Sequence, residues 1–535
     1  MDDDLTLSRP TNTRGYERLT TAVAAVPTVK EDDPMQQDSI AKPKLTEIVA
    51  LNTLNADKLS SLDSQTRELV ERRQRVMGPA YRLSYEEPFQ PIRAQGTKII
   101  DVYGHEYLDA YNNVASVGHN HPHVVDAVCR QLRLMNTNTR YLQRDIVDYA
   151  ENLVSTHDSA LDNVMFTCTG SEANDLAVRI ARTVTGGTGV IVSEYAYHGC
   201  TRDVASWSPS SGKGTVLGSD VRLVPPPDTF RADRAEAETK FLSSLQAQID
   251  DLNRRGVQLA AFVVDSMFSS DGIHPDPGVL KAAIELVHRA GGLLISDEVQ
   301  SGFGRTGEAM WGYQRSNIVA DLVTMGKPMG NGMPIGGVVA KSALLEKFSR
   351  ETAYFNTFGG ENAPVAAAQA VLEVIRDENL IANAQDKGGQ LVAGIREILT
   401  RNNFAADVRG AGLYIGVEFV SDFDTAIPDT ETTLAFVNGL RQHRVLTSTA
   451  GTYGNVIKVR PPLVLSQSDT DRLLTEFDNV ARELRQSARP TPETTTDSPS
   501  DQDPSGVGLG DGAVREELRR LIVEELRGLI GQNHG

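Results

Sequence analysis

The chain has few cysteines, few aromatic residues and a deficit of basic residues. Its 535 residues include three cysteines, two tryptophans and 6% aromatic residues. Cysteines this sparse, with no CxxC pair, argue against a disulfide framework and indicate reduced thiols in a cytosolic setting. The 71 acidic and 53 basic residues give a net charge of −18, which argues against partners such as nucleic acid and anionic membranes.

Long apolar runs are also missing. No stretch of the sequence approaches the roughly 18 apolar residues that span a membrane. The first four residues are Met-Asp-Asp-Asp, the wrong charge for a secretory signal. We therefore expect a cytoplasmic protein, and its 40% hydrophobic content is typical of a globular one.

The centre of the sequence alternates short apolar runs with amphipathic segments. It predicts strands at 163–167, 189–192, 259–265, 293–296, 322–325 and 336–339, and helices at 171–184 and 279–290. This alternation indicates an α/β domain with a mostly parallel sheet. Ligands of such sheets bind beyond the carboxyl ends of the strands. Four polar residues fall just past such ends: Thr169, Asp265, Asp297 and Lys327.

The flanking segments predict further units. Before the centre we expect a helix at 64–76 and strands at 97–102 and 106–109; after it, helices at 379–400 and 468–484 and strands at 412–419 and 456–459. The predicted organisation is a polar, flexible N-terminal extension (1–60), the N-terminal part of a small domain (61–120), a large α/β domain (121–375), the C-terminal part of the small α+β domain (376–487), a flexible acidic linker (488–511) and an amphipathic C-terminal helix (512–531).

The most informative pair of residues is Asp297 and Lys327, each at the end of an apolar run. Pyridoxal phosphate (PLP) chemistry needs a lysine that holds the aldehyde covalently and an acid that keeps the pyridine nitrogen protonated. The alternatives are a helix-capping aspartate and an ordinary surface lysine. The glycine-rich setting of Lys327 at 324–332 favours a partly buried, nucleophilic amine.

A phosphate site is predicted at Gly170 and Ser171, where a strand, a glycine turn and a helix start follow one another at 163–184. A helix N-terminus offers free N–H groups and a positive dipole end, which suit a phosphate. The alternative is a serine that caps an ordinary helix.

From about residue 81 to 485 the sequence resembles the class III (omega-amino) aminotransferases of PLP fold type I. The resemblance rests on the segments 167–175, 195–199, 297–307, 324–332 and 355–360. It implies a PLP-binding large domain and a smaller α+β domain, and no metal. It also implies a role for each cofactor residue: Gly170 and Ser171 hold the phosphate, Tyr197 stacks on the ring, Val299 packs on its other face, Asp297 pairs with the ring nitrogen, Gln300 bonds the ring hydroxyl, Lys327 holds the aldehyde, and Thr357 binds the phosphate of the neighbouring subunit in a homodimer.

The segments 111–119, 136–142 and 145–150 resemble the branch that contains ethanolamine-phosphate phospho-lyase. That branch implies a small-molecule amine substrate, ethanolamine phosphate or 1-amino-2-propanol phosphate, converted to an aldehyde, ammonia and phosphate. Lys458, helped by Arg460, stands where many transaminases place a carboxylate-binding arginine, and Asp265 stands where they often carry glutamate. The alternatives are an omega-amino acid:2-oxo acid transaminase and an inactive scaffold delivered by its C-terminal helix.

The C-terminal helix is predicted from an apolar stripe over 514–530. Because a flexible linker separates it from the core, we interpret it as a docking peptide. Its layout resembles the encapsulation peptides that load enzymes into bacterial microcompartments, which implies a shell protein as partner. The alternative is a helix that folds back onto its own chain.

Overall fold

The computed structural model describes residues 52–54, 56–275 and 278–487. Most of the predicted N-terminal extension lies outside these residues, as do the whole predicted linker and the C-terminal helix at 512–531. The docking of that helix to a shell protein therefore stays a prediction.

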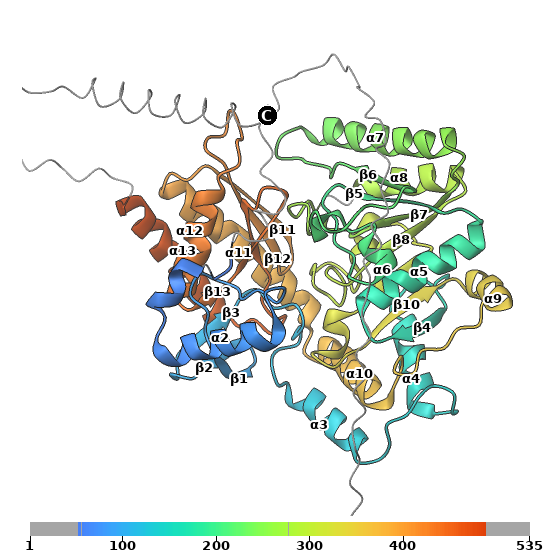
Figure 1. Ribbon diagram of the computed structural model, residues 1–535, viewed down its shortest axis with the longest axis horizontal. Coiled ribbons are helices and arrows are strands. Elements are labelled where there is room, and N and C mark those ends of the chain that lie inside the picture. Colours follow the sequence, from blue (N-terminus) through green and yellow to red (C-terminus); the bar gives the residue numbers. More distant parts are fainter. Residues whose placement is uncertain (1–51, 55, 276–277, 488–535) are drawn as a thin grey trace, which may run out of the picture. The chain divides into compact units, whose positions relative to one another are not determined.

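A seven-stranded sheet forms the centre of the larger domain, with the order β4-β10-β9-β8-β7-β5-β6 (Figure 1). Neighbouring strands from β9 to β6 are parallel, whereas β10 runs antiparallel to both β4 and β9. The predicted mostly parallel sheet is thus confirmed, with one reversed strand. The strands are β4 (Asn163–Thr167), β5 (Gly189–Ser193), β6 (Val221–Val224), β7 (Leu259–Val264), β8 (Leu293–Asp297), β9 (Leu322–Met325) and β10 (Gly336–Ala340).

Helices cover both faces of this sheet (Figure 1). Successive side chains of a strand point to opposite faces, so Val190 and Val192 join one buried cluster while Ile191 joins another. The first cluster includes residues of α5 and α9, and the second includes residues of α7, α8 and α10. The helices of this part are α3 (Pro122–Leu132), α4 (Arg144–Val154), α5 (Gly170–Thr185), α6 (Arg202–Ala205), α7 (Arg234–Arg254), α8 (Gly278–Arg289), α9 (Ser342–Glu351) and α10 (Asn362–Asp377).

Two smaller sheets are built from the flanking segments. The first has the order β1-β2-β3-β13, and the parallel pairing of β13 with β3 joins a C-terminal segment to an N-terminal one. The second, β11-β12-β15-β14, is antiparallel. Their strands are β1 (Pro91–Gln95), β2 (Lys98–Asp101), β3 (Glu106–Asp109), β11 (Ala406–Ala411), β12 (Tyr414–Phe419), β13 (Val445–Leu446), β14 (Ser448–Ala450) and β15 (Val456–Val459).

The remaining helices are α2 (Ser64–Met77), α11 (Leu380–Arg401), α12 (Thr430–Gln442) and α13 (Gln467–Ser487), with 3-10 turns η1 (Ala56–Ser61), η2 (Pro209–Ser211), η3 (Gly312–Ser316) and η4 (Lys327–Gly330). Every helix and strand that the sequence predicts within the described residues is present. The ends differ by no more than two residues, except at the helix predicted at 468–484, which ends three residues later, at Ser487.

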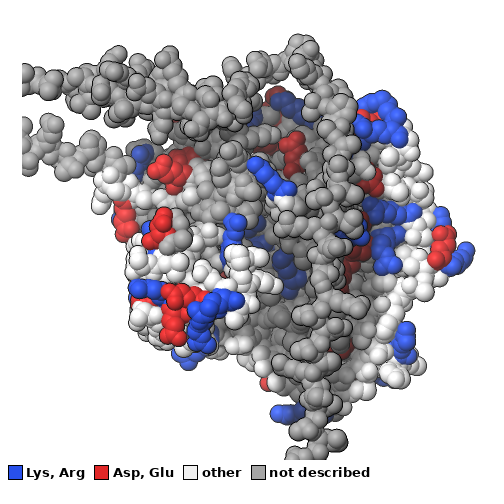
Figure 2. All heavy atoms as spheres, viewed as in Figure 1, with Lys and Arg blue, Asp and Glu red and all other residues white. Residues whose placement is uncertain are grey.

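The surface of the described chain carries both signs of charge. Figure 2 shows acidic and basic side chains interspersed on one face. Across the described ranges, no helix combines the length and apolarity needed to cross a membrane. Nor do those ranges contain a group of three histidine, cysteine or carboxylate side chains placed to hold a metal ion.

Candidate active site

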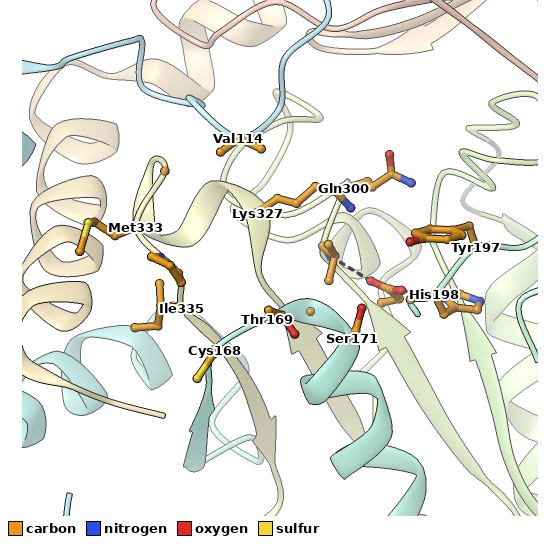
Figure 3. A pocket seen from close by; sticks show the side chains of 16 residues that line it. Val114, Cys168, Thr169, Ser171, Tyr197, His198, Gln300, Lys327, Met333 and Ile335 are labelled. Atoms are coloured by element: carbon orange, nitrogen blue, oxygen red, sulfur yellow. Dashed lines mark hydrogen bonds and ion pairs between the residues drawn. The ribbon is translucent and has the colours of Figure 1, made fainter. Parts of the chain in front are cut away.

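A cavity of about 340 Å³ lies beyond the carboxyl ends of β4, β8 and β9 (Figure 3). It is lined by Val114, Cys168, Thr169, Gly170, Ser171, Tyr197, His198, Gly199, Asp297, Val299, Gln300, Lys327, Gly332, Met333, Pro334 and Ile335. Every predicted cofactor residue except Thr357 is in this set. The three predicted substrate residues are not, although the structure places them nearby.

One side of the cavity is a cradle formed by the N-terminus of α5. Thr169 caps this helix, with its side-chain oxygen accepting the N–H of Glu172 at 3.1 Å. The first N–H groups of a helix have no acceptor inside it, so those of Gly170 and Ser171 remain for a ligand. In Figure 3 Thr169 and Ser171 lie at this helix start, on the floor of the cavity.

Glycines bring the walls of the cradle close together. A Cβ atom on Gly170 would lie 2.7 Å from Cγ2 of Val299, and one on Gly199 would lie 2.5 Å from Oγ of Ser171. The Ser171 hydroxyl also accepts the N–H of Cys200 at 3.2 Å, which joins the 195–200 segment to α5. The cradle is therefore narrow, and it has N–H donors that suit a phosphate group.

Asp297 ends β8, and its side chain is 6% exposed. Its Oδ2 accepts a hydrogen bond from Asn174 at 2.9 Å and lies 2.7 Å from Nδ1 of His198, while its Oδ1 accepts the N–H of Val299 at 3.0 Å. Asn174 is in turn fixed by the hydroxyl of Thr324 at 2.6 Å. The carboxylate is thus oriented from three sides at the rim of the cavity, as an acid that pairs with a ring nitrogen must be.

Sequence reasoning missed these positioning residues, although the signal was present. Asn174 and His198 both stand inside the segments that carried the family resemblance, 167–175 and 195–199. Neither residue type specifies such a role alone, because the contact joins α5, the 195–200 segment and β8 across long sequence distances.

Lys327 begins η4, directly after β9 and Gly326. Its side chain is exposed to the open cavity but surrounded at longer range by dense protein. That surrounding protein lowers the pKa of Lys327, and the Arg460 guanidinium lowers it further, against the opposing effect of Asp297 and Asp265. An amine with a lowered pKa is a better nucleophile and base.

The two residues predicted to pack on the ring differ in exposure. Tyr197 is 43% exposed and Val299 is buried. Both line the same cavity as Lys327. Figure 3 shows Tyr197 and Lys327 there.

Gln300 connects the cavity to a cationic cluster. Its Oε1 accepts hydrogen bonds from Nη1 of Arg460 at 2.5 Å and from the hydroxyl of Tyr414 at 3.1 Å. The guanidinium of Arg460 lies 5.4 Å from the ring of Tyr111 and 5.3 Å from that of Tyr414. Because its oxygen is occupied, Gln300 is left with its amide N–H groups for a ligand oxygen.

Lys458 and Asp265 lie just outside the cavity lining. Burial lowers the pKa of Lys458 to about 7, and the nearby positive charges of Arg460 and Lys327 lower it as well. The carboxylate of Asp265 has the opposite effect. Burial raises the pKa of Asp265. The oxygens of Asp265 accept the N–H groups of Met267 at 3.0 Å and Ser269 at 3.2 Å, so this carboxylate first of all holds its own loop.

Thr357 is the one predicted cofactor residue away from the cavity. It is exposed, in the segment between α9 and α10. The structure describes one chain, and the predicted contact of Thr357 with a neighbouring subunit stays a prediction.

Comparison with known proteins fits this geometry. The family model of class III aminotransferases matches residues 82–481. A Drosophila melanogaster protein named alanine–glyoxylate aminotransferase 2-like is 37% identical over 80% of this chain and 88% of its own length. A Caenorhabditis elegans protein named ethanolamine-phosphate phospho-lyase homolog 1 is 33% identical over 77% of this chain and 93% of its own length. Among solved structures, a phospholyase from Arthrobacter in complex with phosphoethanolamine is similar with a TM-score of 0.75 and 40% identity, covering 77% of this chain and 99% of the other.

The fold and the site define a PLP-dependent enzyme of fold type I. The chain belongs to the class III aminotransferase family. Its glycine cradle, oriented carboxylate and cavity-facing lysine suit the phosphate, the ring nitrogen and the aldehyde of PLP.

Proposed function

We propose that this enzyme is a phospho-lyase that converts a 2-amino-alcohol O-phosphate to an aldehyde, ammonia and phosphate. Ethanolamine phosphate and 1-amino-2-propanol phosphate are the candidate substrates. The observation that carries the proposal is the pair of cations Lys458 and Arg460 beside the cavity, each interacting electrostatically with Lys327. A phosphate is well served by such cations, whereas a carboxylate favours a two-pronged arginine. The likeness to the Arthrobacter phospholyase supports the same choice.

In this proposal each residue of the cavity has a defined task. The N–H groups of Gly170 and Ser171 hold the cofactor phosphate, Asp297 pairs with the pyridine nitrogen, and Lys327 holds the aldehyde. Bound PLP supplies an electron sink for the carbon that carries the substrate amine. The neutral form of Lys327, which its lowered pKa favours, takes the proton from that carbon.

Arg460 and Lys458 favour loss of the substrate phosphate as the next step. Arg460 and Lys458 hold the substrate phosphate on the neighbouring carbon and stabilise the charge that develops when the carbon–oxygen bond breaks. The electron pair of that bond leaves with the phosphate. Addition of water to the remaining unsaturated amine gives the aldehyde and releases ammonia, so no keto acid is needed.

The second candidate is an omega-amino acid:2-oxo acid transaminase. The Drosophila relative, named as an aminotransferase, favours it. The two reactions are separated by incubating the PLP-loaded enzyme with each amino-alcohol phosphate and no keto acid. Equal amounts of phosphate, ammonia and aldehyde over many turnovers support the lyase. Turnover that requires a keto acid contradicts the proposal.

We also propose a homodimer in which Thr357 reaches the cofactor phosphate of the neighbouring subunit. Large apolar side chains gather near this segment in the sequence and the fold: Phe355 is 42% exposed and Phe358 61%. Leu142, in the adjoining segment before α4, is 98% exposed. Apolar surface of this kind indicates a protein partner, and a second copy fits because Thr357 lies outside its own cavity.

Mixed dimers test this arrangement. Lys327→Ala and Thr357→Ala subunits should each be inactive or weak as homodimers. If sites are shared, a mixed dimer combines both defects in one site and leaves the other intact, so mixing restores activity. Activity that never exceeds the average of the two homodimers contradicts sharing but leaves the proposed reaction unaffected.

A further inference from the structure

The loop that follows β7, residues 265–274, has a backbone that its sequence does not favour. Phe268 and Ile273 have φ angles of 45° and 64°, and Gly272 between them has a φ of 135°. Positive φ is unfavourable for a phenylalanine and more so for a β-branched isoleucine. Such a conformation persists only where the surrounding contacts impose it.

Arg409, on strand β11 of a small sheet, supplies such contacts at Gly272 and Ile273. Its Nε donates to the carbonyl of Ile273 at 2.6 Å, and its Nη2 donates to the carbonyl of Gly272 at 2.6 Å. The side chain of Ile273 packs in a buried cluster with Ala411 and Tyr414. The strained part of the loop is thus fixed to the small sheet by both its backbone and its side chain.

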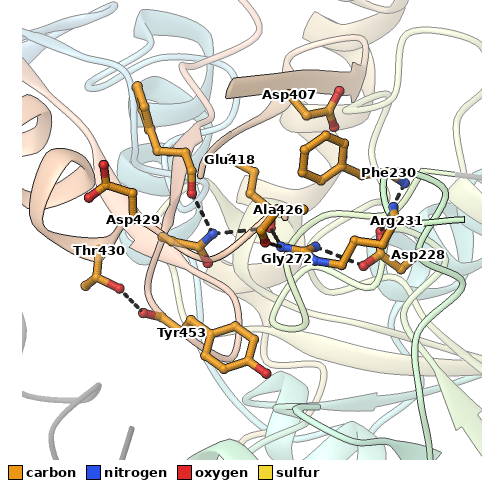
Figure 4. A network of polar contacts seen from close by, with 12 residues as sticks. Asp228, Phe230, Arg231, Gly272, Asp407, Glu418, Ala426, Asp429, Thr430 and Tyr453 are labelled. Carbon is orange, nitrogen blue, oxygen red and sulfur yellow. Dashed lines mark hydrogen bonds and ion pairs between the residues drawn. The ribbon is translucent and has the colours of Figure 1, made fainter. Parts of the chain in front are cut away.

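Carboxylates hold the guanidinium in this place. Arg409, with a side chain only 10% exposed, bonds Asp407 through Nη1 at 2.7 Å and Glu418 through Nη2 at 2.7 Å. The second oxygen of Glu418 accepts from Arg231 at 2.5 Å, and Arg231 pairs with Asp228 at 3.0 Å (Figure 4). Burial opposes charge on Glu418, but Arg409 and then Arg231 lower its pKa. The two direct carboxylate partners, Asp407 and Glu418, therefore keep Arg409 in a fixed place and charged.

The same loop reaches the candidate active site through Asp271. This buried carboxylate accepts a hydrogen bond from the hydroxyl of Ser193 at 2.6 Å and another from the N–H of Tyr195 at 2.8 Å. Tyr195 begins the segment that carries Tyr197 and His198, both of which line the cavity. The chain of contacts runs without a gap from Arg409 to the residues around the proposed ring position.

We propose that Arg409 is a positioning residue: by fixing the loop at Gly272 and Ile273 it sets the place of Asp271 and, through Tyr195, of Tyr197. The inference rests on the PLP site and not on the choice between lyase and transaminase. It assigns to the small sheet a direct part in shaping the cofactor pocket.

The test compares Arg409→Lys with Arg231→Lys. Lysine keeps the charge beside Glu418 but, as a point donor without the planar fork, does not reproduce the four contacts of Arg409. Arg231→Lys is the matched control, because Arg231 shares Glu418 but bonds neither Gly272 nor Ile273. The measurements, at saturating PLP, are the visible circular dichroism of the bound cofactor, kcat and KM, and the melting temperature.

We expect Arg409→Lys to alter the visible circular dichroism and to lower kcat by about 10- to 100-fold, as for a small misplacement of groups in the site. Arg231→Lys should change neither, even where it lowers the melting temperature. An Arg409→Lys protein with a lower melting temperature but a wild-type spectrum and kcat would overturn the proposal. If that variant does not fold, Asp271→Ala decides, because it removes both acceptors of the Ser193 and Tyr195 hydrogen bonds. It should alter the spectrum in the same way, and a wild-type spectrum and kcat in Asp271→Ala would overturn the proposal equally.

Discussion

Replacing Gly199 with alanine should loosen the phosphate cradle. Gly199 has a φ of 148°, and an added Cβ would lie 2.5 Å from Oγ, 2.7 Å from Cβ and 2.8 Å from Cα of Ser171. The contact with the hydroxyl can be relieved by rotation of the Ser171 side chain, but the contacts with Cβ and Cα cannot. Reaching an ordinary separation of about 3.4 Å requires the 195–200 segment and the start of α5 to move apart by roughly 0.7 Å (3.4 − 2.7).

The size of the expected change in PLP affinity depends on whether the strain is present in the free or the bound state. A residue forced into a sparsely populated φ costs about 1–3 kcal/mol. Without the cofactor the 195–200 segment can relax, whereas the bound state needs the cradle closed, so the cost falls on binding. Since 1.4 kcal/mol is tenfold in affinity, the dissociation constant of PLP should rise roughly 10- to 100-fold.

The assay is equilibrium dialysis of PLP against the folded protein, with the melting temperature measured in parallel. Two controls separate the causes. Gly212 has a positive φ of 91° but open space around it, and Gly214 has open space with no positive φ. Alanine at Gly212 should lower stability without changing affinity, and alanine at Gly214 should change neither. Wild-type affinity in Gly199→Ala would refute the close approach of Gly199 and Ser171 as the basis of the cradle.

Three further outcomes are expected. Lys327→Ala should give no cofactor adduct by intact mass after borohydride reduction and should lower turnover by about 10²–10⁴-fold or more, because the site loses its base; an adduct at another lysine would contradict the assignment. Asp297→Asn should keep its contact with Asn174 but lower kcat far more than it changes KM, since an amide holds no charge opposite a protonated ring nitrogen. Because the pKa of Lys458 is about 7 and only its protonated form attracts phosphate, KM for the amino-alcohol phosphate should rise above pH 7. Lys458→Arg should move that rise to higher pH. If the dependence of KM on pH is the same in Lys458→Arg as in the wild type, Lys458 does not belong to the phosphate site.

Helix and strand ends were predicted well where they depend on residues that are close along the chain. β4 begins and ends where the apolar run predicts, and α5 begins one residue before the predicted start because Thr169 caps it. Lys327 and Asp297 were found because each follows a buried strand, and carboxyl ends of parallel strands meet at one edge of a sheet. The reversed direction of β10 was not predicted, since an apolar run of five residues has no direction.

The contacts that orient the site residues could not be predicted from the sequence. Asn174 and Asp297 are 123 residues apart, and Arg409 and Ile273 are 136 apart. Such pairs depend on how the sheets pack, which periodicity does not encode. The occupied oxygen of Gln300 is another case, because Arg460 reaches it from 160 residues away.

The sequence alone determined the family and the cofactor and predicted the residues that would meet the cofactor, because those signals reside in short segments whose backbone is fixed locally by glycines, caps and strand ends. Only the tertiary structure decided how those residues are held. It showed that Asp265 is engaged by its own loop, that Asp297 is oriented by Asn174 and His198, and that a buried arginine from another sheet bonds the loop behind the cavity. The physical reason is that orientation and pKa depend on distances between segments, and those distances exist only once the chain has folded.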